Sequence, residues 1–178
     1  QGGDVFMSAG QTTAASKEGG DFEIKAGTGA STTQGNGGDV TIYGGEGKGT
    51  DNGLSMGGDI SLIGGTAASN SGGSIYVTTG MGTQDSSGQI RLSTYDSGPQ
   101  GVSGDVTVLT GDSSAGDSGQ FTLSTGYATG GTGGFVDVIV GTGTSGQGGY
   151  ISLSAGATSG TDGLTGGDVT VTTGSSSR

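Results

Sequence analysis

The chain has 178 residues, of which 46 are glycine, 1 is proline and none is cysteine or histidine. This composition excludes collagen, a proline-rich linker, a disulfide framework and a thiolate metal site. Acidic residues outnumber basic ones by 16 to 5, and the net charge of -11 argues against nucleic-acid binding, which needs clustered Lys and Arg.

Apolar residues are scarce but regularly placed. Leu, Ile, Val and Phe make up roughly 17% of the chain, a share that together with the net charge is typical of disorder. No apolar run is long enough to span a bilayer, so we expect no membrane insertion. We give the regular spacing more weight than the composition and expect an ordered chain.

A short unit recurs along the whole chain, and residues 166–174, GGDVTVTTG, show it most clearly. Successive copies begin about 15 to 20 residues apart, a spacing typical of solenoids. We count eleven copies, which open at Gly2, Gly19, Gly37, Gly57, Gly72, Ser87, Ser103, Ser118, Gly133, Gly148 and Gly166.

Two positions of the unit are apolar in every copy. Counting the opening residue as position one, position four holds Val5, Phe22, Val40, Ile60, Ile75, Ile90, Val106, Phe121, Val136, Ile151 and Val169. Position six holds Met7, Ile24, Ile42, Leu62, Val77, Leu92, Val108, Leu123, Val138, Leu153 and Val171. This alternation predicts a short β-strand in each copy, with positions four and six on the inner face.

The segments between strands are built of Gly, Ser, Thr and Ala, for example TAASNS after Gly65. We interpret them as the return side of a flattened coil, because they are too short for a crossover helix. Stacked coils would lie about 4.8 Å apart. The sequence therefore predicts an all-β fold: a single β-solenoid domain over residues 1–178, with about eleven short coils and a parallel sheet along its length.

The two end copies are as regular as the internal ones, and no capping element covers them. Val5 and Met7 in the first copy and Val169 and Val171 in the last would then lie at open sheet edges. Such edges predict head-to-tail association of the chain with itself into a filament, although a slice of a longer repeat chain would look the same. Lateral contact through an outward apolar stripe is a further possibility, formed by Ile63, Leu109, Phe135, Ile139 and Tyr150.

No catalytic group is recognisable. Without His or Cys nothing activates the many hydroxyls, so we expect no enzyme. In the predicted stack, Asp4, Asp21, Asp39 and Asp59 at position three would form a column. Each carboxylate could accept a backbone N–H in the glycine turn, or the column could hold cations such as calcium. The calcium-binding RTX repeat matches only in part, because here Asp directly precedes the inner residue.

The GGDVTVTTG-type units resemble the glycine-rich repeats of secreted microalgal surface proteins and, more generally, β-solenoid adhesins. The resemblance implies an extracellular or cell-surface structural role and no catalytic residues or cofactor. The Thr-rich strands also resemble β-solenoid antifreeze proteins, as at Thr170 and Thr172, but Lys25 and Tyr76 interrupt such a plane. Ice binding and repeat-mediated adhesion are therefore the alternatives to a filament or surface layer.

Overall fold

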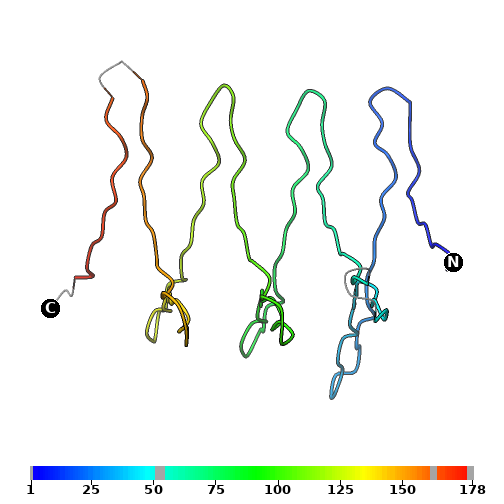
Figure 1. The fold of residues 1–178 in the computed structure, drawn as a ribbon. Helices are drawn as coiled ribbons and strands as arrows, with labels where there is room; N and C mark the ends of the chain where they lie inside the picture. The colour runs from blue at the N-terminus through cyan, green and yellow to red at the C-terminus, as the bar shows by residue number, and fades with distance from the viewer. Residues whose placement is uncertain (1, 51–54, 161–163, 176–178) are drawn as a thin grey trace. The chain divides into compact units, whose positions relative to one another are not determined.

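The computed structural model describes residues 2–50, 55–160 and 164–175. These residues contain no helix and no strand. The chain divides into two units, Gln1–Arg91 and Leu92–Arg178. In both units, open stretches of backbone that correspond to the repeat copies alternate with reversals of the chain (Figure 1). The predicted single domain over residues 1–178 stays a prediction.

The predicted β-solenoid with a parallel sheet is wrong, because the described residues form no strand and hence no sheet. The same finding removes the predicted strands, coils and sheet edges. The physical reason lies in how consecutive copies are joined.

Six of the ten junctions between consecutive copies contain a contact that we call the neck. In a neck, the carbonyl of the closing glycine accepts a hydrogen bond from the N–H of residue two in the next copy. Gly20 donates to Gly10 over 2.8 Å, Gly38 to Gly27 over 2.9 Å and Gly88 to Gly80 over 3.0 Å. The same bond joins Gly58 to Gly45, Gly73 to Gly65 and Gly167 to Gly156.

A second contact joins position eight of one copy to position two of the next, both at necks and at junctions without the neck bond. A Cβ built on Gly20 would lie 3.6 Å from Cβ of Ala9, and one on Gly134 would lie 3.3 Å from Cβ of Thr125. The tightest case is Gly149, where it would lie 2.7 Å from Cγ1 of Val140. Where position eight is itself glycine, at Gly44 and Gly64, the two backbones meet directly.

This packing accounts for a regularity in the repeat: position two is glycine in all eleven copies. In copies two to eleven a Cβ there would touch the position-eight residue or the closing backbone, whereas one on Gly3 in the first copy meets nothing within 4 Å. The contact would be closer than 3.4 Å at Gly20, Gly58, Gly73, Gly88, Gly134 and Gly149. Several position-eight side chains at these junctions are also half-buried, namely Ala9, Ala26, Thr79 and Ala155.

The necks explain why the solenoid does not form. In a solenoid, the return segment must carry the chain back beside the start of the strand it has just left. At the six necks the end of one copy and the beginning of the next lie within hydrogen-bond distance, so the segment between them closes on itself as a loop. Two consecutive copies joined end to start cannot lie side by side in parallel register.

The loops satisfy part of their backbone locally through hydroxyl side chains. The Ser31 hydroxyl accepts the Gln34 N–H over 3.3 Å, and the Ser113 hydroxyl accepts the Gly116 N–H over 3.2 Å. In the second unit, Gly101 N–H donates to Gly98 carbonyl over 3.1 Å, with Pro99 at the turn position that its fixed φ favours. These are turn-forming interactions and they bury nothing.

Residues 2–50, 55–160 and 164–175 enclose no hydrophobic core, and none of them is buried. The accessible surface of the chain is 18145 Å². A compact monomer of 16.8 kDa would expose about 7,600 Å² and a fully unfolded chain about 24,000 Å². On its own, therefore, the chain removes far less surface from water than a folded domain of its size does.

Replacing a position-two glycine should open its neck. In the Gly88→Ala variant the new Cβ would lie 3.2 Å from Cβ of Thr79, so the bond from the amide of residue 88 to Gly80 weakens. We expect that amide to exchange with solvent faster by up to about tenfold, the size of one net hydrogen bond. Amide exchange measured by NMR checks this. Gly80→Ala is the matched control, because a Cβ on Gly80 meets nothing within 4 Å.

The lack of a core has a calorimetric consequence. A dilute, monomeric sample should show no cooperative heat-absorption peak on heating, because no apolar core is exposed in the process. Differential scanning calorimetry at a concentration where sedimentation shows monomers is the measurement. A sharp transition under those conditions would contradict the coreless chain.

Candidate functional site

The apolar positions of the repeat form the most regular exposed feature of the chain. Position-four side chains are 51–65% exposed in copies two to eleven, and Val5 in the first copy is 88% exposed. Large residues at the outward positions five and seven, such as Phe6, Tyr43 and Ile139, are 84–89% exposed. Position-four side chains are thus partly covered, whereas the large side chains at positions five and seven are not. Successive side chains therefore still point to opposite sides of the backbone, although the described residues form no strand.

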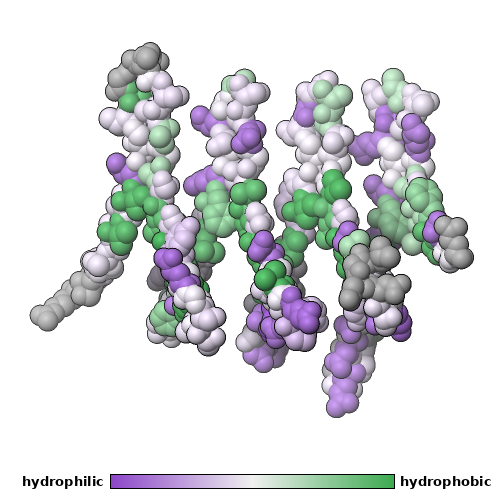
Figure 2. Space-filling view, in the orientation of Figure 1, coloured by the Kyte–Doolittle hydropathy of each residue, from purple (hydrophilic) through white to green (hydrophobic). Residues whose placement is uncertain are grey.

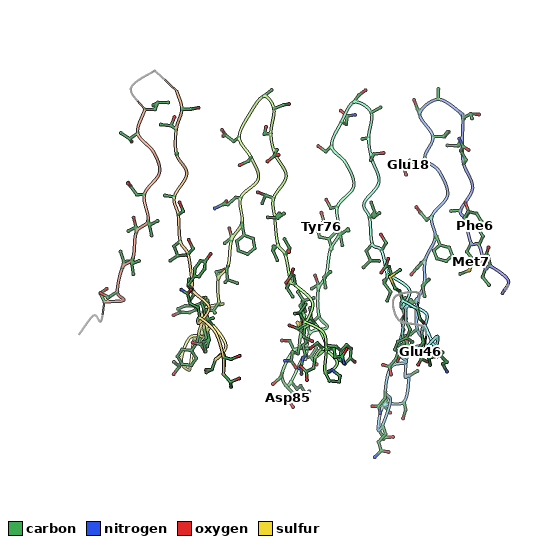
Figure 3. All side chains as sticks on the ribbon, viewed as in Figure 1. Phe6, Met7, Glu18, Glu46, Tyr76 and Asp85 are labelled. Carbon is green, nitrogen blue, oxygen red and sulfur yellow. The ribbon has the colours of Figure 1, made fainter. Side chains whose placement is uncertain are left out.

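Position six is more open than position four. Its side chains range from Ile24 at 60% exposed to Val171 at 87%. Figure 2 shows hydrophobic residues at the surface on the open stretches of both units, and Figure 3 shows side chains standing off the backbone, with Phe6 and Met7 near the N-terminus. Within the described residues, the apolar pairs of the repeat therefore face water.

The four residues predicted to form assembly edges lie at the surface. Met7 is 67% exposed and Val169 56%, and Val5 and Val171 are almost fully exposed. Val5 and Met7 belong to the first unit, Val169 and Val171 to the second. The described residues give these side chains no strand to border, so their role in assembly stays a prediction.

The aspartates of the predicted column are also at the surface. Asp4, Asp21, Asp39 and Asp59 are all exposed, each directly after the position-two glycine. Across residues 2–50, 55–160 and 164–175, no three acidic side chains gather as a metal site would require. In the same ranges, the aspartate that accepts a hydrogen bond is Asp85, from the Ser86 N–H over 2.8 Å. Neither of the two roles proposed for the column is seen.

The residues of the predicted lateral stripe are exposed as well. Ile63, Leu109, Phe135, Ile139 and Tyr150 of the predicted lateral stripe are all more than 80% exposed. One ion pair is present in the described part, between Lys48 and Glu46 over 3.4 Å, and both side chains face solvent, where such a pair adds little. The described residues enclose no pocket and include no helix able to cross a membrane.

The contact missed by reasoning from sequence is the neck. The signal was present as glycine at position two of every copy, together with a small or β-branched residue at position eight. Glycine in a repeat can mark a special backbone angle or a close approach between chain segments. Here, close approach is the reason.

Comparison with known protein families, with curated proteins and with solved structures found no match to this chain.

Proposed function

We propose that this chain is a structural protein that associates with further copies of itself, as a building block of a filament or a surface layer. The observation that supports this proposal is the regular set of apolar residues at positions four and six, none of which the described chain buries. A placement outside the cell is part of the proposal, supported by the resemblance to secreted glycine-rich repeats.

The backbone supports the same proposal. Backbone–backbone hydrogen bonds of the described residues lie at the necks and at the turn Gly98–Gly101. Among the described residues, the N–H and C=O groups of the apolar stretches between necks therefore have no backbone partner. An extended segment with free backbone groups and one apolar side can pair with another such segment.

A second copy of the chain is the partner that the repeat favours. Another copy presents the same apolar pairs at the same spacing, so one matched contact brings neighbouring copies of the unit into register. The first and last copies carry the same pair as the internal ones, at Val5 and Met7 and at Val169 and Val171. Association through such a surface has no reason to stop at a dimer, which leads to polymers.

Like charge opposes this association. Each chain carries a net charge of -11, so copies repel one another at low ionic strength. The attraction must come from apolar burial and backbone pairing, both of which are short-ranged. No observation in the structure favours ice binding, adhesion or catalysis over this proposal.

Removing position-four side chains should weaken assembly. We expect the triple variant Ile60→Ser, Ile75→Ser and Ile90→Ser to raise the critical concentration at least about tenfold, because each isoleucine contributes about 1.5–3 kcal/mol when buried. Sedimentation measures the critical concentration, and electron microscopy identifies the polymer.

The matched control replaces three outward residues, Tyr43→Ser, Ile63→Ser and Tyr76→Ser, which remove as much apolar surface from the opposite side. This control should change the critical concentration far less. An equal effect of the two triple variants would contradict the proposed surface, and a chain that stays monomeric at every concentration would contradict self-assembly.

Salt should promote assembly. Raising the ionic strength from about 0.01 to 0.15 M shortens the screening length from about 30 to 8 Å, which weakens repulsion between chains. We expect a lower critical concentration, measured by sedimentation.

The fourfold variant with Asp4, Asp21, Asp39 and Asp59 replaced by Asn should reproduce this effect at low salt, because it removes negative charge. Loss of assembly in that variant would instead mean that these carboxylates hold chains together through cations, and the repulsion argument would fail.

A further inference from the structure

We propose that Asn36–Gly37 is a modification site at which the chain rearranges its own backbone by deamidation. Asn36 and Gly37 are both exposed and follow the bends of the second loop. A Cβ built on Gly37 would have only the Gly27 carbonyl oxygen near it, at 4.0 Å, so no neighbour crowds the α-carbon of Gly37. The inference is independent of self-assembly.

The hydrogen bonds of the loop leave the required nucleophile free. Gly38 N–H is held by the Gly27 carbonyl over 2.9 Å, whereas none of the described residues accepts a hydrogen bond from Gly37 N–H. A free peptide nitrogen followed by a residue without Cβ can rotate toward the preceding side chain. Gly37 nitrogen and the side-chain amide carbon of Asn36 are the two atoms that must meet.

The reaction uses only these two residues and water. Gly37 nitrogen bonds to Cγ of Asn36, the side-chain nitrogen leaves as ammonia, and the peptide N–H proton leaves with it. The product is a five-membered succinimide. Water then adds to one of its two carbonyl carbons and breaks that carbon's bond to the Gly37 nitrogen, which gives either aspartate or isoaspartate.

Asn70 provides the comparison within the same chain. It is exposed and lies in a loop closed by the Gly65–Gly73 neck, but its neighbour is Ser71. The Cβ of a serine hinders the rotation that ring closure needs. Asn36 and Asn70 are thus both exposed, and they differ in the residue that follows each of them.

The rearrangement would act on the second neck. A Cβ on Gly29 would collide with the carbonyl oxygen of Asn36, so the backbones of these two residues face each other two positions inside the Gly27–Gly38 bond. Isoaspartate adds one carbon to the backbone on the Asn36 side of the loop and none on the Gly29 side. The two sides of the loop therefore no longer align. Isoaspartate also adds a negative charge near Asp39. We expect the neck to open.

The test is ageing of the full-length protein at mildly alkaline pH, followed by peptide mapping that separates aspartate from isoaspartate. We expect Asn36 to react at least about tenfold faster than Asn70, equivalent to about 1.4 kcal/mol in the barrier. Gly37→Ala should bring the rate at Asn36 close to that at Asn70. As isoaspartate accumulates, exchange of the Gly38 amide should become faster.

Two results would overturn the proposal. Asn36 could prove as slow as Asn70, or Gly37→Ala could leave its rate unchanged, and either outcome would show that Gly37 is not the attacking group. Asn36→Gln, which lengthens the side chain and disfavours the five-membered ring, should show neither the modification nor the change at the Gly38 amide. Ageing that accelerates Gly38 exchange in this variant would remove the link to the neck.

Discussion

The neck is the contact on which the rest of the structure depends. A closing carbonyl, the N–H of a position-two glycine and a small or β-branched side chain at position eight meet at the junction between copies, as at Gly10, Gly20 and Ala9. The contact is local, since it joins residues separated by one loop, and closing so short a loop costs little entropy. Each junction can therefore form without help from distant parts of the chain.

The same locality explains the exposed apolar residues. A neck holds the two ends of a loop together, but it brings no position-four side chain against another. Ile60 and Ile75 remain more than half exposed although the loop between their copies is closed at Gly65 and Gly73. Covering these side chains requires contacts that the necks do not provide, and this is the physical basis for the proposal that further copies of the chain cover them.

The sequence predicts part of this structure and misses the part that decides the topology. The repeat, the alternation of Val169 and Val171 with threonines, and the position of the turns all follow from spacing and residue type. The same alternation suits parallel coils and chain segments joined end to start, so it could not distinguish them. Which of these two topologies forms depends on the path of the roughly six residues between copies. In that segment Ser, Thr and Gly fit a return strand as well as a closed loop. The aspartate column was predicted from the stack, and without the stack nothing in the described residues brings Asp4 and Asp21 together.

The glycine content opposes ordering of this chain, and its net charge opposes association between copies. A chain with 46 glycines loses much conformational freedom when it orders, so each neck, closed by one hydrogen bond and one small contact, is weak. A net charge of -11 keeps separate copies apart. The proposed assembly therefore requires that many apolar pairs be covered at once, because any single pair is too weak to overcome both terms. The eleven copies of the unit matter for this reason: repetition in one chain supplies the simultaneous contacts that no single copy can.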